Sequence, residues 1–239
     1  METVATDIRL GERAAVVVRP TTGEGWPGVV MIHEIWGVDD ELRRQADRLA
    51  AAGFVVMAPD MFGEGPRLRC MISVFKALRA RSGPAFDLIG RARDELRADA
   101  QTSDKVGVLG FCMGGGFALL MGSDGFDASS VNYGMIPEDV SDVLRGSCPV
   151  VASYGGRDTQ LVKQVPRLQA ALVDLGIPHD LEVYPTAGHS FLNQQNNAPV
   201  LVRPLLRLGH AGPEPAAAAD AWRRIEAFFG EHLGSGTAS

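Results

Sequence analysis

Four short apolar runs constrain the fold of this chain more than any other feature of its sequence. They cover residues 29–32, 55–58, 106–109 and 149–152, and most of their side chains are aliphatic, with valine frequent. Apolar runs of this length without polar alternation are typical of strands buried on both faces. Weaker strand candidates are residues 14–18, 128–133 and 180–184. The pattern predicts a central sheet of about seven or eight strands.

The segments between these runs carry apolar residues at helical spacing. The sets are Leu42, Ala46, Leu49 and Ala50; Phe86, Ile89, Leu96 and Ala100; Leu161, Val165, Leu168, Leu172 and Leu175; and Trp222, Ile225 and Phe229. Asp39 and Asp40 before the first set are typical helix caps, and Gly53 after it is a typical helix end. Strands that alternate with helices predict an α/β fold with a mostly parallel sheet covered on both faces.

The length of 239 residues suits one domain, and no internal repeat or low-complexity linker divides the chain. We therefore expect a single domain over residues 1–239. Residues 203–219, rich in proline, glycine and alanine, are expected to form a surface connection before the last helix. The tail, residues 234–239, has nothing to bury and is expected to be disordered.

Charge and terminal sequence argue against several classes of partner. The formal charge of −6 gives no basic field for nucleic acid or an anionic membrane. Glu2 and Asp7 stand where a signal peptide would carry basic residues, and no apolar run follows. No apolar stretch reaches the ~20 residues that a transmembrane helix needs. We expect a cytoplasmic protein, monomeric or homodimeric, with no nucleic-acid or membrane partner.

The three cysteines, Cys70, Cys112 and Cys148, are odd in number and far apart. Their spacing is that of neither a disulfide framework nor a structural zinc site, and the five histidines add no matching cluster. No metal site is therefore expected.

Cys112 lies where a buried strand runs directly into a helix. The sequence Gly-Phe-Cys-Met-Gly-Gly-Gly at 110–116 follows the strand at 106–109, and the next residues look helical. The G-x-C-x-G spacing is that of a nucleophile elbow with cysteine in place of serine. A helix N-terminus favours a thiolate, and the Met113 N–H would be one oxyanion donor. The alternative is a buried cysteine beside a phosphate-binding turn, but neither G-x-G-x-x-G nor G-K-[ST] is present.

Two further candidates follow Cys112 in the chain order of α/β-hydrolases. Asp158 comes just after the strand near residue 150, and His189 comes after the next strand. Catalytic groups gather at this edge of a parallel sheet. Taken alone, Asp158 is equally a helix cap and His189 a loop histidine, but with the elbow they predict a triad.

The segment His33-Glu34-Ile35-Trp36-Gly37 follows the first central strand, where hydrolases place a second oxyanion donor. We assign that donor to the Ile35 N–H. Glu34 is expected to project toward Cys112, with an ordinary exposed loop acid as the alternative.

With these residues in place, the chain resembles the dienelactone hydrolase (carboxymethylenebutenolidase) family. The matching pieces are residues 33–37, Pro-Asp-Met-Phe at 59–62, Gly-Phe-Cys-Met-Gly-Gly at 110–115, Gly-Gly-Arg-Asp at 155–158 and Ala-Gly-His-Ser-Phe at 187–191. The resemblance implies Cys112 as nucleophile, His189 as base and Asp158 as orienting acid. It further implies that Glu34 interacts with the thiol during activation, and that an acyl-thioester forms without a cofactor.

The resemblance also bears on the substrate, which it implies to be a small ester or lactone. The namesake enzymes carry an arginine four residues after the catalytic histidine to hold a substrate carboxylate, and Asn193 stands there in this chain. Trp36, Tyr133, Phe191 and Asn193 are candidate substrate-binding residues. The segment from Arg67 to Arg81 is basic with an apolar helical face, so it is either a solvated face or the source of one arginine for the pocket.

Two other functions compete with hydrolysis. The first is a catalytically silent scaffold that binds a ligand or regulates a partner, against which the intact triad argues. The second is a redox thiol protein, which lacks support because no C-x-x-C or nearby resolving cysteine accompanies Cys112.

Overall fold

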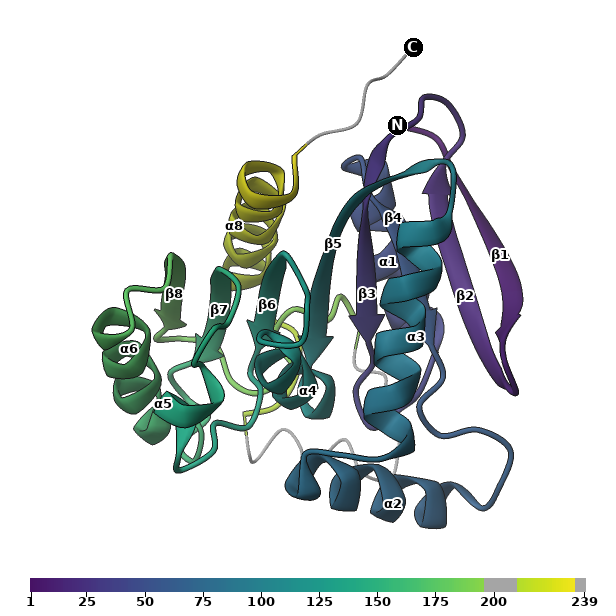
Figure 1. Ribbon diagram of the computed structural model, residues 1–239. Coiled ribbons are helices and arrows are strands. Elements are labelled where there is room, and N and C mark those ends of the chain that lie inside the picture. Colours follow the sequence, from purple (N-terminus) through teal and green to yellow (C-terminus); the bar gives the residue numbers. More distant parts are fainter. Residues whose placement is uncertain (196–209, 235–239) are drawn as a thin grey trace.

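The computed structural model describes residues 1–195 and 210–234. They form one eight-stranded sheet in the order β1-β2-β4-β3-β5-β6-β7-β8 (Figure 1). The six parallel strands are β3 (Trp26–Ile32), β4 (Val55–Pro59), β5 (Thr102–Phe111), β6 (Ala128–Asn132), β7 (Val150–Gly155) and β8 (His179–Tyr184). The predicted α/β fold with a mostly parallel sheet is therefore confirmed.

The N-terminal edge of the sheet is a hairpin of β1 (Thr3–Leu10) and β2 (Arg13–Pro20), and β2 also pairs antiparallel with β4. Strand β2 extends the run predicted at 14–18. Strand β1 was not expected from the sequence, because it is an edge strand and most of its side chains stay exposed. A strand without a buried face leaves little hydrophobic pattern to read.

Helices cover both faces of the sheet. Those of one face are α3 (Pro84–Ala98), α4 (Met113–Met121), α5 (Val140–Val143) and α6 (Val165–Asp174), which the 3-10 turn η1 (Val162–Gln164) precedes. Helix α2 (Arg67–Ala80) packs against α3 and α4 beyond the carboxyl ends of the strands (Figure 1). Helices α1 (Asp40–Ala51) and α8 (Pro215–Leu233) cover the other face. The N-cap of α1 is Asp39, whose carboxylate accepts a hydrogen bond from the Leu42 N–H at 2.9 Å, as the sequence predicted.

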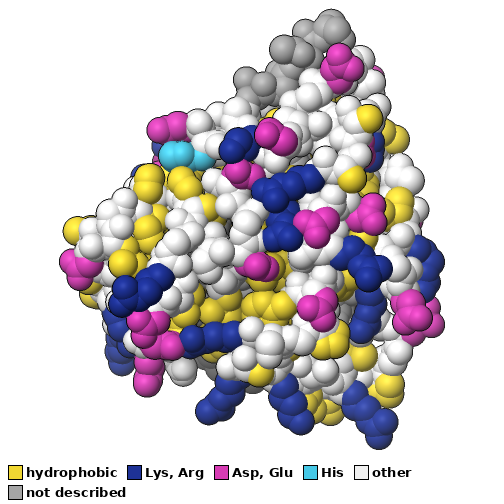
Figure 2. Space-filling model, in the orientation of Figure 1, with side chains coloured by type: hydrophobic (Ala, Val, Ile, Leu, Met, Phe, Trp, Pro, Cys, Tyr) yellow, Lys and Arg dark blue, Asp and Glu magenta, His cyan; other side chains and the backbone are white. Residues whose placement is uncertain are grey.

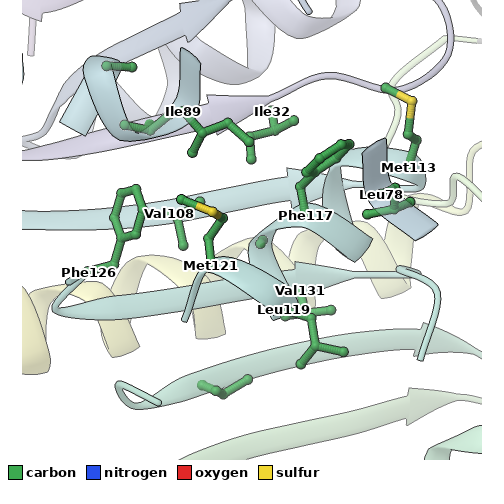
Figure 3. Packing of buried hydrophobic residues seen from close by; sticks show 14 of the residues in the cluster. Ile32, Leu78, Ile89, Val108, Met113, Phe117, Leu119, Met121, Phe126 and Val131 are labelled. Atoms are coloured by element: carbon green, nitrogen blue, oxygen red, sulfur yellow. The ribbon is translucent and has the colours of Figure 1, made fainter. Parts of the chain in front are cut away.

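Two apolar cores result, one on each face, because neighbouring residues of a buried strand point to opposite sides. On β3, Val30 and Ile32 join the α3 and α4 side, whereas Val29 and Met31 join the α1 and α8 side. Figure 3 shows the first core, in which Phe117 and Met121 of α4 pack with Ile89 and Val108. Each of these side chains is at most 1% exposed. The four predicted apolar runs lie in β3, β4, β5 and β7, and their strand residues are buried, as predicted.

The C-terminal part of the chain differs from expectation at one point. Helix α8 begins at Pro215, so the end of the expected surface connection at 203–219 is helical. Proline suits the first turn of a helix, and the Glu214 carboxylate caps it by accepting from the Ala217 N–H at 2.5 Å. Residues 203–209 of that connection, and residues 235–239 of the expected disordered tail, lie outside the described residues.

Candidate active site

Cys112 occupies the sharp turn that the sequence predicted between β5 and α4. Its φ of 56° and ψ of −114° are unusual for a residue with a side chain. The turn closes only because its neighbours are glycines. A Cβ on Gly110 would overlap the Gly114 carbonyl, and a Cβ on Gly114 would overlap the Ile32 carbonyl. The chain therefore holds Cys112 at the first turn of a helix, at the edge where the parallel strands end.

His189 and Asp158 meet at the same edge of the sheet. Asp158 follows β7 and His189 follows β8, and the His189 Nδ1 lies 2.6 Å from the Asp158 Oδ2. The second carboxylate oxygen of Asp158 accepts from the Leu161 N–H at 3.3 Å. Asp158 therefore caps the following turn, as the alternative interpretation of the sequence predicted, and also binds the histidine.

The contacts of His189 favour its charged form. Burial opposes protonation, but the Asp158 hydrogen bond and the interaction with the neighbouring Cys112 outweigh it and raise the pKa of His189 to about 10. Burial also acts against ionisation of Asp158, yet the His189 bond leaves the pKa of that carboxyl below its usual value. The structure thus brings Cys112, His189 and Asp158 to one edge of the sheet, where His189 and Asp158 are hydrogen-bonded to each other.

Glu34 lies in the loop after β3 and is only 5% exposed, which rules out the ordinary surface acid. Ser190 Oγ donates to its Oε1 at 2.8 Å, and Asn193 Nδ2 donates to its Oε2 at 3.2 Å. Burial raises the pKa of Glu34, while the Ser190 hydrogen bond and the charge of His189 act in the opposite direction. The carboxyl group is therefore held beside the candidate triad in a largely apolar setting.

Two buried side chains of helix α1 hold Asn193 and the residues after it by hydrogen bonds. Gln45 Nε2 donates to Asn193 Oδ1 at 3.0 Å, which leaves the Asn193 amide nitrogen to face Glu34. The buried Glu41 accepts from the backbone N–H groups of Gln194 and Gln195 at 2.7 and 3.3 Å. The sequence analysis missed both α1 residues. Their spacing in the sequence could have revealed them. Glu41 and Gln45 are polar residues four apart that stand beside Leu42 and Ala46, on the helix face expected to be apolar.

His33 has a structural place next to Glu34. Its Nε2 accepts from the Met61 N–H at 3.0 Å, so Nδ1 carries the proton and donates to the Glu34 carbonyl at 2.5 Å. The ring is fully buried against Phe62. The hydrogen bonds tie the loop after β3 to the end of β4, and His33 has no free nitrogen for catalysis.

Each candidate oxyanion donor lines a cavity that Cys112 also lines. Met113 is the first residue of α4, so its N–H has no acceptor within the helix. Ile35 lies in the loop after β3, where its carbonyl accepts from Arg67 at 3.1 Å. A turn closed by the Gly37 N–H and the Glu34 carbonyl at 3.2 Å holds this loop.

Cys112 and His189 line two cavities. The larger, about 430 Å³, is mainly apolar, with Arg157 and Gln160 among its polar residues; its other lining residues are Phe75, Leu78, Met113, Tyr133, Met135, Asp158, Thr159 and Leu161. The smaller, about 120 Å³, is lined by Glu34, Ile35, Trp36, Ser190, Asn193, Gln195, Ala211 and Gly212. Of the candidate substrate-binding residues, Tyr133 thus lines the larger cavity, and Trp36 and Asn193 line the smaller.

Phe191 is placed differently from the sequence-based expectation. It is fully buried and lines neither cavity. Its ring packs against Tyr133 and Tyr184, with centroid distances of 5.6 and 5.1 Å. Phe191 therefore supports the wall of the site from the core rather than contacting the cavity.

The basic segment of α2 does not supply a cation to these cavities. Neither cavity is lined by any of its five cations, Arg67, Arg69, Lys76, Arg79 and Arg81. Arg81 pairs with Asp139, and Arg67 is occupied by the Ile35 carbonyl. Figure 2 shows Lys and Arg side chains projecting from the lower edge of the molecule, where Figure 1 places α2. The solvated basic face is therefore the better interpretation of this segment.

Over residues 1–195 and 210–234, no group of three or more potential ligands is arranged to hold a metal ion. Within the same residues, no helix has the length and apolar character to cross a bilayer.

The family of this chain follows from comparison of its sequence with known proteins. The sequence model of the dienelactone hydrolase family matches residues 14–233. The carboxymethylenebutenolidase of Rhodococcus opacus is 29% identical over 236 residues, which cover 91% of this chain and 86% of that protein. A dienelactone hydrolase-like promiscuous phosphotriesterase from metagenomic libraries has a TM-score of 0.79 at 21% identity, covering 97% of this chain and 99% of the other.

The dienelactone hydrolase of Anabaena variabilis has a TM-score of 0.66 at 22% identity, with 97% and 98% of the two chains covered. At these identities the two structural likenesses establish the α/β fold. The family match extends over almost the whole chain and carries the assignment. This protein is a hydrolase that belongs to the dienelactone hydrolase family.

Proposed function

We propose that this chain hydrolyses a small carboxylic ester or lactone through an acyl-thioester on Cys112, with His189 as acid and base and Asp158 as its orienting partner. One observation carries the proposal. Cys112, strained at the elbow, lines both cavities together with a histidine that Asp158 holds at 2.6 Å.

The first half-reaction forms the thioester. The Cys112 thiolate attacks the carbonyl carbon, and the Met113 and Ile35 N–H groups stabilise the negative oxygen of the tetrahedral intermediate. The intermediate collapses by breaking the carbon–oxygen bond to the leaving group, which takes the proton of the His189 imidazolium. For a lactone, the leaving alcohol or enol stays attached to the acyl group, since the bond that breaks lies in the ring.

The second half-reaction releases the acid. Neutral His189 removes a proton from water, and the resulting hydroxide attacks the thioester carbonyl. Breaking of the carbon–sulfur bond then releases the acid and the Cys112 thiolate, and the imidazolium formed when His189 took the proton completes the starting ion pair. Side chains and backbone amides supply every group that these steps use. Throughout, the Asp158 carboxylate keeps the histidine oriented and offsets its positive charge.

Glu34 is proposed to assist activation of the thiol. It is buried next to His189 and lines the smaller cavity with Cys112. Its hydrogen-bond partners Ser190 and Asn193 are neutral, and the charge that acts on its carboxyl group is that of His189. Because Asn193 stands where the namesake enzymes carry arginine, we propose that the substrate carboxylate of those enzymes is not required here.

The test is a screen of short aryl esters and enol lactones, each with and without a free carboxylate. Wild-type protein is compared with Cys112→Ala. Turnover that depends on Cys112 supports the proposal, and the relative rates of charged and neutral substrates give the charge preference. If no substrate is turned over faster than by Cys112→Ala, the hydrolytic proposal fails and the silent scaffold becomes the better account.

A further inference from the structure

We infer that the outer face of helix α2 docks on an anionic lipid surface and delivers lipid-dissolved esters to the larger cavity. The inference rests on the proposed function of Cys112, because it says how a substrate of that function arrives. Three observations carry it: exposed apolar side chains on α2, cations beside them, and their place at the opening of the cavity.

Helix α2 carries apolar side chains on two faces, and only one face is packed. Val74 and Leu78 are buried and belong to the core. Residues at i, i+4 and i+7 form the outer stripe, and their side chains are 63%, 46% and 38% exposed in the order Leu68, Ile72, Phe75. With Met135 they make up four of the eight exposed large apolar side chains among the described residues. Such a gathering marks an interaction surface.

Cations without a carboxylate partner stand beside this stripe. No acidic residue occurs between Glu64 and Asp87. Three cations of α2, each three or four residues from a member of the stripe, have no ion pair in the part of the chain that the structure describes: Arg69, Lys76 and Arg79. Figure 2 shows basic and apolar side chains together along the lower edge of the molecule, where Figure 1 places α2. The net charge of −6 describes the whole chain, whereas this face is basic.

The stripe leads to the opening of the larger cavity. Phe75 and Met135 line that cavity together with Cys112, yet both are exposed, so they stand where the cavity meets solvent. Leu78 joins them from the packed face of α2, and a Cβ on Gly116 would contact both Leu78 and Met135. An apolar ester that reaches the outer face of α2 therefore meets apolar side chains on its way to the thiol.

Charge and position together select the occupant of this face. A symmetric dimer would use the same patch on both subunits, so like charges would meet. An acidic protein would match the charge, but it would cover Phe75 and Met135 and close the cavity to substrate. An anionic lipid surface matches both the cations and the apolar side chains, and it holds apolar esters beside the opening.

Sedimentation with sucrose-loaded vesicles tests the docking without reference to catalysis. Wild-type protein at low salt should bind vesicles of equal parts phosphatidylglycerol and phosphatidylcholine, and should bind pure phosphatidylcholine about 100-fold more weakly. Added salt should weaken the binding to anionic vesicles. Lys76→Gln combined with Arg79→Gln should cost about 30-fold in affinity, about fivefold for each cation. Leu68→Gln combined with Ile72→Gln should cost about tenfold, because less apolar surface is buried.

Val173→Gln combined with Arg223→Gln is the matched control. Val173 of α6 is 58% exposed, Arg223 belongs to α8, and neither lines a cavity with Cys112. The control should bind like wild type. Three results overturn the inference: wild type that binds neither kind of vesicle, wild type that binds both kinds equally, and losses in the control equal to those of the α2 variants.

Two further results would assign the face to another occupant and overturn the inference as well. One is a concentration-dependent dimer in sedimentation velocity that Leu68→Gln combined with Ile72→Gln abolishes, which indicates a second copy of the chain. The other is binding of polyglutamate without binding of anionic vesicles, which indicates an acidic protein.

Catalysis by the same variants tests delivery. With p-nitrophenyl decanoate dissolved in anionic vesicles below saturation, both α2 variants should be slower than wild type by the factor that their binding loses. With p-nitrophenyl acetate in water they should equal wild type, because the substituted residues line neither cavity. Unchanged decanoate turnover, or an equal loss on acetate, contradicts delivery. Failure of the proposed function looks different: wild type and Cys112→Ala are then equally inactive on both esters, while vesicle binding persists.

Discussion

Asp158→Asn tests the histidine–aspartate pair with a minimal change, because asparagine keeps the size of the side chain and removes its charge. In the structure, the Asp158 carboxylate lies 2.6 Å from His189 and is 12% exposed. A hydrogen bond between charged groups contributes about 1.5–3 kcal/mol. If about 2 kcal/mol of this is lost in the transition state, kcat/KM falls about 30-fold.

The pH dependence of kcat/KM should change as well. Burial opposes the charge on His189, but the Asp158 bond is the largest cause that raises its pKa to about 10. Without the carboxylate, the pKa of His189 falls. Because the leaving group takes its proton from the imidazolium, the alkaline decline of kcat/KM should move to lower pH in Asp158→Asn.

The contribution of this pair to the free energy of unfolding should fall at both high and low pH. The raised pKa of His189 means that its stabilisation is full below the ordinary value of 6.5 and is lost as pH rises through about 10. The lowered pKa of Asp158 means that its stabilisation is present above the ordinary value of 3.8 and is lost as pH falls. The stability difference between wild type and Asp158→Asn should therefore be greatest between these two ordinary values.

The assay is steady-state hydrolysis of a neutral aryl ester across the pH range, together with urea unfolding at several pH values. Asp220→Asn is the control, since Asp220 is an aspartate that accepts from Tyr184 and lines neither cavity. An Asp158→Asn enzyme with the rate and pH profile of Asp220→Asn would refute the reasoning.

Two further substitutions test the elbow and the support of Glu34. Gly114→Ala should destabilise the fold by about 3 kcal/mol or more in urea unfolding, because the new Cβ overlaps the Ile32 carbonyl; a loss within the error of the measurement would contradict the tight elbow. Asn193→Leu should lower the free energy of unfolding by about 2 kcal/mol and lower kcat, because it removes the hydrogen-bond partner of Glu34 Oε2 and of Gln45 Nε2. Unchanged stability would show that these bonds are not formed in solution.

Much of the fold could be predicted from local sequence. The runs at 29–32 and 106–109 lie in β3 and β5, because strands buried on both faces leave no polar alternation to confuse the pattern. Strand β1 escaped notice because its side chains are mostly exposed. Residues 215–219, predicted as a loop from their composition, are helical because Pro215 and Glu214 start α8.

Some residues of the candidate site could also be predicted from local sequence, and others could not. Cys112, Asp158 and His189 could be located because each follows a strand in a recognisable motif. Gln45 and Ser190 could not, since their importance comes from contacts across the fold with Asn193 and Glu34. Separations of 148 and 156 residues leave no local signal of such contacts.

The central claim concerns Cys112 as the nucleophile, and intact-protein mass spectrometry after rapid acid quench tests it most directly. During turnover of a slow aryl ester, the protein should gain the mass of one acyl group, and peptide mapping should place it on Cys112. The adduct should disappear as the acid product forms, and Cys112→Ala should show neither adduct nor turnover. Full turnover by Cys112→Ala, or an acyl group on another residue in wild type, would contradict the account.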